Sequence, residues 1–395
     1  MSLLSKYYSS KDQIETEGLR CWLEINLSNL KNNIESIRNI ISDNLDIICV
    51  VKANGYGLGA VNIAKYLSSI KIKYFAVATL EEALELRNSG IENKEIIILS
   101  WTPVSKKEIL IKYKLTQTLI DYEYTKKIKE LPSILKCHIK IDTGMNRYGE
   151  NYNNVEKIKE MYNFKNLKIL GIFSHLCRSR EFGEEADNFT RMQIKKFDII
   201  IGKLENEGIN VGLKHIINSF GILRFNEKKY DLVRPGLLMY GVSPDPNNKE
   251  IDKLLEENKF KPVASLKCKV MTVKIIQKGE KVGYNNKYTA DEQTKIANIS
   301  IGYADGLSFA SSRNGFNVII KGYLCPIIGN ICMDNTIVKI PFDSDIKEGD
   351  IVIIFGYNNN GVEHMNHKEF LSKSGSPIGE TFSRLGQRIT RIFHL

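Results

Sequence analysis

Residues 47–59 read IICVVKANGYGLG, an apolar run that ends in a lysine and continues into a glycine-rich turn. The β-branched run predicts a buried strand, and the glycines after it predict a turn. A lysine at that point is held by a rigid strand with little water around it. Such surroundings lower the pKa of an ammonium group and make the amine available for Schiff-base chemistry. The alternative is a lysine that leaves the core and extends into solvent.

Length and composition indicate a globular protein of two domains. The chain has 395 residues, of which 43% are hydrophobic. This is longer than one compact domain usually is, and the hydrophobic content suits a substantial core. No run of about eighteen apolar residues occurs, so we expect no membrane span or membrane partner. Residues 1–18 contain no signal-peptide core and are predicted to be a loosely ordered leader.

The seven cysteines are scattered and never form a Cys-x-x-Cys pair. Most lie in apolar, strand-like surroundings, where free cysteine packs as a small hydrophobic residue. The pattern argues against a zinc site and for a reducing compartment. We therefore expect no metal and a cytoplasmic location.

The net charge of +10 raises the question of nucleic-acid binding. The lysines, however, are spread along helical patterns and interleaved with acids, as in KKIKE at residues 126–130. They form no patch interleaved with aromatic residues and no recognisable nucleic-acid module. A solvated surface explains the charge better, so no nucleic-acid partner is expected.

From residue 22 to about residue 241, short apolar runs alternate with helical patterns. Leu30, Ile34, Ile37 and Ile41 form one apolar stripe of a helix for which Ser28 is a suitable N-cap. Further strands are predicted at residues 74–78, 96–99, 116–120, 137–142, 170–173, 213–217 and 231–233. About eight strand–helix units predict a TIM-type (β/α)8 barrel over residues 19–245. An open doubly wound sheet is the alternative, but its G-x-G-x-x-G fingerprint is missing.

Polar side chains follow several of the predicted barrel strands. In a parallel barrel the chemistry lies at the C-terminal ends of the strands. Five residues occur directly after predicted strands: Lys52, Arg147, His175, Ser219 and Arg234. Because five such residues follow predicted strands, the sequence predicts a functional site at the C-terminal ends of the barrel strands.

The pattern of predicted secondary structure changes at the turn-forming residues 244–249, PDPNNK. A short acidic helix is predicted at 250–258, followed by alternating strands separated by Gly and Asn turns. Strands are predicted at residues 264–276, 296–301, 318–320, 327–328, 337–340 and 351–355. Residues 246–395 are therefore predicted to be a second, mainly β domain.

Eight strings, in order along residues 22–393, resemble those of the alanine racemase family, the fold-type-III enzymes that use pyridoxal phosphate (PLP). They are residues 51–57 (VKANGYG), 140–147 (KIDTGMNR), 174–175 (SH), 218–219 (NS), 234–236 (RPG), 283–284 (GY), 301–306 (IGYADG) and 331–334 (ICMD). The resemblance implies the barrel followed by a β domain, with PLP as cofactor. It further implies a homodimer with shared active sites that interconverts L- and D-alanine, a precursor of peptidoglycan.

The resemblance assigns two bases to the reaction. Racemisation removes the Cα proton from one face of the amino acid and returns a proton to the other, so two groups on opposite faces are needed. By resemblance Lys52 carries PLP and is one base. Tyr284, supplied by the other subunit, is the second, with His175 and Arg234 as a hydrogen-bonded positive chain beside it. A plain strand tyrosine is the alternative for Tyr284.

By resemblance Arg234 also faces the pyridine nitrogen of the cofactor, a position where enzymes use Asp or Arg. Arginine keeps its own proton and so leaves the ring nitrogen unprotonated, which makes the ring a weaker electron sink. With a weaker electron sink the carbanion formed at Cα is short-lived, which favours its fast reprotonation over transamination. The alternative is a surface ion pair.

The remaining assignments concern the phosphate and the substrate. The phosphate would be bound by the Ser219 hydroxyl, the backbone amides of Gly236 and Leu237, and Tyr56, within a site that also includes Asn218. Ser219 alone could equally be a turn or cap residue.

Arg147 and the backbone amide of Met333 from the partner subunit would hold the substrate carboxylate. Lys140 occupies the position that is carbamylated in some family members.

Two residues depart from the family pattern. Leu58 stands where a histidine is usual, and Gln387 stands where many members have a tyrosine near the substrate. Gln387 is smaller and polar, so a substrate with a hydroxyl group could be accepted. A serine or broad-specificity amino-acid racemase is therefore the first alternative to alanine.

Two further alternatives come from other classes. Fold-type-III decarboxylases share the layout but use a cysteine in a Cys-Asp-Gly-like string, whereas this chain has Cys332-Met333-Asp334. A non-enzymatic PLP carrier would need only the barrel and its lysine. The second domain and Tyr284 favour the racemase over both.

Overall fold

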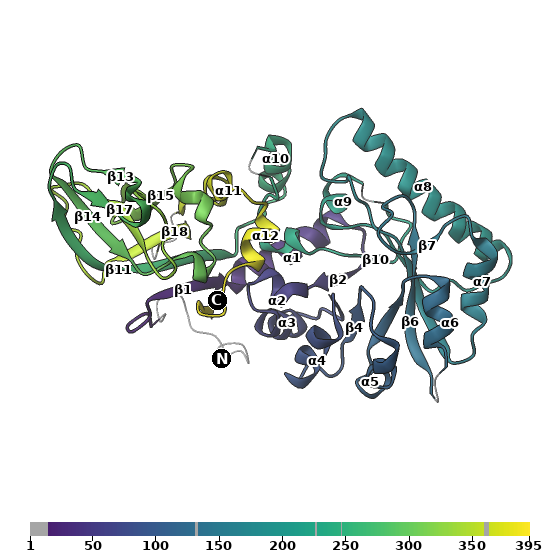
Figure 1. The fold of residues 1–395 in the computed structure, drawn as a ribbon. Helices are drawn as coiled ribbons and strands as arrows, with labels where there is room; N and C mark the ends of the chain where they lie inside the picture. Colours follow the sequence, from purple (N-terminus) through teal and green to yellow (C-terminus); the bar gives the residue numbers. More distant parts are fainter. Residues whose placement is uncertain (1–14, 131–132, 226, 246, 359–362) are drawn as a thin grey trace. The chain divides into compact units, whose positions relative to one another are not determined.

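The computed structural model describes residues 15–130, 133–225, 227–245, 247–358 and 363–395. Most of the predicted leader, residues 1–14, lies outside this description. The chain divides into two compact units (Figure 1). We call Asn33–Gly55 with Ala60–Met239 the barrel unit, and Met1–Asn32, Tyr56–Gly59 and Tyr240–Leu395 the β-rich unit.

The barrel unit contains eight parallel strands in the order β10-β2-β3-β4-β5-β6-β8-β9. They are β2 (Asp46–Val50), β3 (Tyr74–Val77), β4 (Glu95–Ile98), β5 (Thr116–Leu119), β6 (Leu135–Asp142), β8 (Leu167–Phe173), β9 (Leu213–His215) and β10 (Leu232–Val233), with β7 (Glu150–Asn151) beside β6. A parallel bridge between Asn218 and Arg234 joins the two ends of this order. The strands therefore form a nearly closed barrel, which confirms the predicted fold class.

Most of the helices here connect barrel strands and lie outside them (Figure 1). They are α1 (Leu27–Ile40), α2 (Lys52–Tyr56), α3 (Ala60–Ser69), α4 (Leu80–Asn88), α5 (Lys107–Lys112), α6 (Tyr122–Ile128), α7 (Val155–Asn163), α8 (Glu184–Asn206) and α9 (Ser219–Arg224), with 3-10 turns η3 (Val104–Lys106) and η4 (Leu237–Tyr240). The predicted stripe of α1 is buried. The predicted cap is wrong: the Asn29 amide donates to Asn26 Oδ1 at 2.8 Å, so the helix begins one residue before Ser28.

The β-rich unit is built on a nine-stranded sheet with the main order β16-β15-β18-β11-β1-β20. Its strands are β1 (Cys21–Asn26), β11 (Ala264–Ile276), β14 (Thr294–Ile299), β15 (Asn317–Ile320), β16 (Tyr323–Pro326), β17 (Thr336–Lys339), β18 (Ile351–Tyr357), β19 (Glu363–Met365) and β20 (Thr390–His394). The remaining elements are the pair β12 (Lys281–Val282) and β13 (Tyr288–Thr289), helices α10 (Lys249–Glu257), α11 (His367–Ser374) and α12 (Ile378–Ser383), and 3-10 turns η5 (Tyr284–Asn286), η6 (Tyr303–Asp305) and η7 (Phe309–Ser312).

Strand β1 is not in the barrel, although the predicted barrel domain began at residue 19. It pairs with β11 antiparallel, with Cys21 opposite Cys268, and with β20 parallel. Its apolar residues Trp22, Leu23 and Ile25 are fully buried. Such residues suit a buried strand of either sheet, so the sequence pattern could not show to which sheet β1 belongs. A second correction concerns residues 327–328, where the structure has only a bridge from Ile327 to Val338 and no strand.

Two further findings bear on the expectations from composition. All seven cysteines are free thiols. In the described part of the chain, no helix combines the length and the apolar character that a membrane crossing needs.

Candidate active site

Lys52 directly follows the buried end of β2 and begins an unusual turn. Ala53, Asn54 and Gly55 have φ angles of 52°, 53° and 64°, and Tyr56 follows with 57°. Four successive residues are thus left-handed, a conformation that costs roughly 1–2 kcal/mol for each residue other than glycine. Backbone strain of this kind is concentrated at functional sites.

Packing and hydrogen bonds close this turn. The Gly55 amide donates to Val51 O at 2.8 Å, and the Ala60 amide donates to Asn54 Oδ1 at 2.9 Å. A Cβ on Gly55 would lie 3.2 Å from Ala60 N, a tight contact, and its φ of 64° is one that favours glycine. The strand and turn predicted from IICVVKANG are confirmed, although the left-handed form of the turn was not foreseen.

The surroundings of Lys52 favour a neutral amine. Burial, followed by the positive charge of Arg147, lowers the pKa of the Lys52 ammonium, and Glu82 opposes the shift. Among the described residues no carboxylate forms an ion pair with Lys52. The lysine therefore has the electrostatic setting expected of an amine that attacks a carbonyl group.

Arg234 is buried at the end of β10 and lies next to two histidines. Its Nη1 is 2.7 Å from His215 Nδ1, and its Nη2 is 3.4 Å from His175 Nδ1. Nη2 also donates to the Ser174 carbonyl at 2.7 Å. Burial lowers the pKa of Arg234 to about 9, and burial followed by the charge of Arg234 lowers the pKa of His175. The surface-ion-pair alternative for Arg234 is therefore wrong.

The hydrogen bonds of Arg234 continue to two residues that sequence reasoning missed, His215 and His138. His215 Nε2 lies 2.8 Å from His138 Nδ1. Because arginine only donates, His215 Nδ1 accepts from Arg234 and its Nε2–H donates to His138. We call His175, Arg234, His215 and His138 the histidine–arginine row. Burial lowers the pKa of His138 to about 3, so it is neutral at pH 7.

A signal for His138 was present in the sequence. His138 and Lys140 are two residues apart on β6, so their side chains point to the same face of the strand, and both are buried. Lys140 Nζ donates to the Ile141 carbonyl at 2.7 Å. Burial, followed by the charge of Arg234, lowers the pKa of Lys140 to about 7.

The predicted phosphate-binding residues lie around the start of α9. Ser219 Oγ accepts the Gly236 amide at 2.9 Å and the Leu238 amide at 3.3 Å, so Ser219 and the 236–238 backbone are in direct contact. Leu237 begins the short turn η4 between these two amides. Asn218 is the N-cap of α9 through its bond from Gly221 N, and its Nδ2 donates to Leu176 O.

Arg147 lies in the loop after β6, with its guanidinium 4.8 Å from the ring centre of Tyr148. The Tyr148 hydroxyl donates to Leu99 O at 2.9 Å, which ties this loop to the end of β4. Arg147 itself is exposed. Its charge lowers the pKa of Lys52, of His175 and of Lys140.

Tyr56, Tyr284 and Met333 belong to the β-rich unit. Tyr56 packs edge-on against Tyr240 with ring centres 5.7 Å apart, and burial raises its pKa to about 12. Tyr284 is 70% exposed in η5 and Met333 is 52% exposed. Asn330 Nδ2 donates to the Tyr284 carbonyl at 3.1 Å.

The loop that carries Met333 is fixed by backbone bonds. The amides of Tyr303 and Ala304 donate to the carbonyls of Cys332 and Met333, each at 3.0 Å. A Cβ on Gly302 would lie 2.3 Å from Met333 O, so this close approach requires glycine. The strings IGYADG and ICMD, far apart in sequence, therefore meet in one structure.

The two residues that depart from the family pattern differ in exposure. Leu58 is fully buried, and Gln387 is exposed. Arg388, next to Gln387, forms a 2.8 Å ion pair with Asp334, which connects the C-terminal segment to the Met333 loop.

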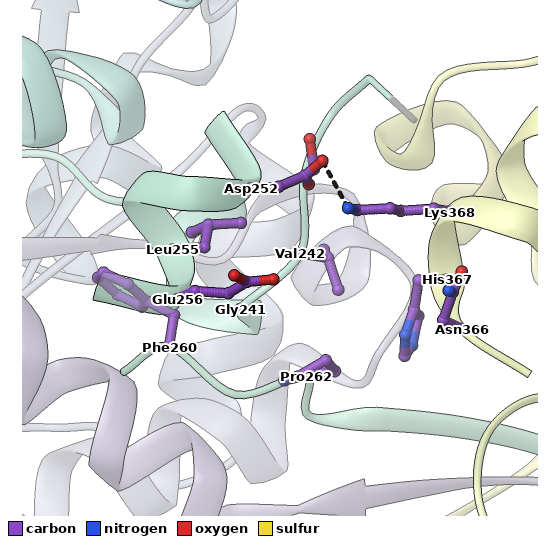
Figure 2. Close-up of a pocket in the computed structure, with 11 residues that line it drawn as sticks. Gly241, Val242, Asp252, Leu255, Glu256, Phe260, Pro262, Asn366, His367 and Lys368 are labelled. Atoms are coloured by element: carbon purple, nitrogen blue, oxygen red, sulfur yellow. Dashed lines mark ion pairs between the residues drawn. The ribbon is translucent and has the colours of Figure 1, made fainter. Parts of the chain in front are cut away.

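Two cavities lie away from all the predicted site residues. One of about 240 Å³ lies between α10 and α11, where Lys368 Nζ meets Asp252 Oδ2 at 2.5 Å (Figure 2). The other, of about 390 Å³, adjoins the start of β2 and the exposed pair Lys73–Asp46. Neither brings together the chemistry that Lys52 and Arg234 provide.

Comparison with known protein families identifies the family of this chain. The family model described as "Alanine racemase, N-terminal domain" matches residues 25–244, and "Alanine racemase, C-terminal domain" matches residues 263–393. The chain belongs to the alanine racemase family.

Relatives within this family agree with the assignment. The alanine racemase of Clostridium tetani is 35% identical over 94% of this chain and 95% of its own length. An amino-acid racemase of Enterococcus faecalis is 38% identical over 98% of this chain, but the chain spans only about half of that relative, 53%.

Solved structures of the family have the same fold. The alanine racemase of Clostridium difficile 630 has a TM-score of 0.86 at 33% identity, covering 95% of this chain and 96% of its own. The alanine racemase of Bartonella henselae with covalently bound pyridoxal phosphate has a TM-score of 0.82 at 27% identity, covering 95% and 99%. The predicted family, barrel-plus-β fold and racemase function, hence the isomerase class, are confirmed.

Proposed function

We propose that this chain is a PLP-dependent alanine racemase that interconverts L- and D-alanine with Lys52 and Tyr284 as its two bases. The observation that carries the proposal is the setting of Lys52. It stands at the end of a barrel strand, its pKa is lowered by burial, and no described carboxylate pairs with it. Such an amine is suited to a covalent link with an aldehyde cofactor.

The residues of the barrel unit fit the cofactor. Arg234 is a buried cation whose described partners are two histidines and backbone carbonyls, which leaves it suited to a neutral ring nitrogen. Ser219 and the adjoining backbone of Gly236 and Leu237 offer a hydroxyl and amides to a phosphate, with Asn218 fixing this segment. By resemblance Tyr56, which belongs to the β-rich unit, would add a phenol. When bound, PLP supplies the electron sink that acidifies the Cα proton of the amino acid.

The two bases would act from opposite faces of the amino acid. Lys52, whose pKa is lowered by burial and then by Arg147, would take or return the proton on one face. Tyr284, exposed in its own chain, would be delivered to the opposite face by the partner subunit. Arg234, whose Nη2 lies 3.4 Å from His175 Nδ1, would maintain positive charge near that tyrosine, with His175 between them as in the family.

The substrate carboxylate would be held by Arg147 and by the backbone amide of Met333 from the partner subunit. Lys140 would brace Arg147. Its lowered pKa, about 7, makes the neutral amine available, which suits carbamylation. An added CO₂ in the intact mass of the native protein would identify this modification.

Serine or a broader set of amino acids is the second candidate for the substrate. Gln387 stands where many members have tyrosine, and the relative from Enterococcus faecalis is named an amino-acid racemase. A polar, smaller side chain there would accept a substrate hydroxyl. The decarboxylase alternative is less suitable, because burial raises the pKa of the Cys332 thiol and disfavours a reactive thiolate.

The assembly we propose is a homodimer with two shared sites. Tyr284 and Met333 are large exposed side chains on loops of the β-rich unit, as residues awaiting a partner would be. D-Alanine made in this way would serve peptidoglycan synthesis. A cytoplasmic location stays a prediction from the cysteine pattern.

The decisive experiment measures D-amino acids formed from L-alanine, L-serine and L-lysine, with and without added PLP. We expect the highest kcat/KM for alanine and dependence on PLP. A kcat/KM for alanine below the values for serine and lysine would exclude alanine as the main substrate.

Tyr284→Phe distinguishes the racemase from a PLP carrier. We expect this variant to retain PLP while racemisation falls strongly, because only one base remains. A chain that binds PLP but racemises none of the three amino acids would support the carrier and exclude our proposal.

A further inference from the structure

We propose that Glu82 is a positioning residue for Lys52, because its carboxylate fastens the left-handed turn that carries the lysine to the neighbouring strand end. This inference rests on the proposed role of Lys52 and extends it to a residue outside the site described above.

The carboxylate of Glu82 bonds three backbone amides. Its Oε1 accepts the Ala53 amide at 2.6 Å, and its Oε2 accepts the amides of Ala78 at 2.7 Å and Thr79 at 3.3 Å. Ala53 directly follows Lys52, whereas Ala78 directly follows β3. Since β2 and β3 are paired neighbours, one side chain joins the carboxyl ends of two adjacent barrel strands.

Helix capping alone does not explain this arrangement. Glu82 is the third residue of α4 and forms a capping box with Thr79, whose Oγ1 accepts the Glu82 amide at 3.3 Å. A capping box requires only the reciprocal bond between these two residues. The bond to Ala53 reaches 29 positions back along the chain and adds nothing to the helix. Because the acceptor is ionised, it is also a strong type of hydrogen bond.

The turn after Lys52 has an unfavourable backbone conformation that such a hydrogen bond would stabilise. Ala53, Asn54 and Tyr56 are all left-handed, which L-residues disfavour. The two other bonds of the turn hold Gly55 and Asn54. The bond from Glu82 therefore acts on the residue adjacent to Lys52 and fixes the direction in which the lysine leaves the strand.

The charge of Glu82 has a second effect on the same lysine. Burial and Arg147 lower the pKa of Lys52, and the negative charge of Glu82 partly offsets them. Replacing the carboxylate should therefore loosen the turn and lower the pKa of Lys52 further.

Glu82→Gln tests the inference, with Glu81→Gln and Thr79→Ala as controls. Glutamine keeps one acceptor oxygen, so it cannot accept the Ala53 amide on one side and the Ala78 amide on the other. Glu81→Gln removes an exposed carboxylate from the same first turn of α4, and Thr79→Ala removes the cap hydroxyl but leaves the Ala53 bond. For each holoenzyme we would measure the rate at which hydroxylamine extracts PLP, together with kcat and KM for L-alanine.

We expect Glu82→Gln to release PLP about tenfold faster and to lower kcat about 10- to 100-fold, with KM changed far less, since a hydrogen bond to a charged group is lost. Both controls should match the unsubstituted enzyme in PLP release and kcat, although Thr79→Ala should be less stable to heat. If Glu82→Gln does not fold, Glu82→Asp applies the same test, because aspartate keeps the charge but is too short to reach the amides of Ala53 and Ala78 together.

The outcomes separate this inference from the proposed function. An unsubstituted chain that holds no PLP would refute the proposed function, and this inference with it. If the unsubstituted chain is loaded and active, and the Glu82 variants behave like Glu81→Gln, the inference alone is wrong.

Discussion

At the scale of single residues, Arg234 shows how burial determines chemistry. Its guanidinium bonds His215, His175 and the Ser174 carbonyl, and no described carboxylate neutralises it. Burial lowers its pKa, and its donors in turn fix which nitrogen of His215 carries a proton. The orientation of the histidine–arginine row therefore depends on the planar, several-donor shape of arginine.

Arg234→Lys should lower kcat about 10- to 100-fold with little change in KM, because a single ammonium nitrogen lacks the planar fork with which the guanidinium reaches partners on different sides. The matched control is Arg87→Lys, since Arg87 is half-buried and bonds the backbone carbonyls of Tyr113, Ile91 and Lys94. Steady-state racemisation of both variants checks the prediction. An equal loss of kcat in both would contradict it.

The buried histidines predict sensitivity to acid. The pKa of His138 is lowered to about 3 in the folded chain, below the value near 6.5 of an exposed histidine. Between these values the unfolded chain binds more protons, so stability is full above pH 6.5 and falls as the pH decreases. At pH 5 this one histidine accounts for a loss of about 2 kcal/mol.

His138→Gln should reduce the slope of stability against pH by about one proton between pH 6.5 and 5. The check is the midpoint of urea unfolding at pH 7.5, 6.0 and 5.0 for both proteins. Glutamine itself does not titrate, so any destabilisation it causes at pH 7.5 is constant and can be subtracted. Identical slopes would show that His138 is not the titrating group.

At the scale of elements, periodicity predicted most of the barrel but could not place a strand in a sheet. The α1 stripe, β2 and β11 follow from spacing along the chain, and the site residues after the barrel strands follow from the same pattern. Residues 21–26 were included in the barrel domain, because the partners of β1 lie more than 200 residues away. Glu82 and His215 were missed for the same reason: their roles come from contacts between distant segments.

A buried ion pair joins β1 to β11 beside their backbone pairing. Lys267 Nζ lies 2.8 Å from Glu24 Oε2, both side chains are almost fully buried, and Trp22 Nε1 donates to Glu24 at 2.9 Å. Lys267→Met would leave the Glu24 carboxylate buried without its cation, at a cost of about 3–5 kcal/mol. The exposed Lys274→Met on the same strand should change stability by about 0.5 kcal/mol at most.

Thermal and urea unfolding of these variants check that prediction. The double variant Glu24→Gln with Lys267→Met should recover part of the loss, because it removes the unpaired charge. A Lys267→Met variant as stable as Lys274→Met would mean that the pair does not hold β1 in the sheet.

At the scale of the whole molecule, the proposed bases belong to different units of the chain. Lys52 is in the barrel unit and Tyr284 in the β-rich unit, where it is 70% exposed. The proposed mechanism brings them together from two subunits, so each active site needs two chains. Catalysis and dimerisation are then one property, and the dependence can be tested without knowing the interface.

Co-expression of Lys52→Ala and Tyr284→Phe chains should restore activity that neither variant has alone. In a mixed dimer one site contains both substitutions, and the other contains an intact Lys52 and an intact Tyr284. Random pairing makes half of the dimers mixed, so about a quarter of all sites should be active. Racemisation of L-alanine by the doubly tagged, purified mixed dimer checks this, with each variant alone as control. Absence of any recovery in a confirmed mixed dimer would place both bases in one chain, because only then does every site carry a substitution.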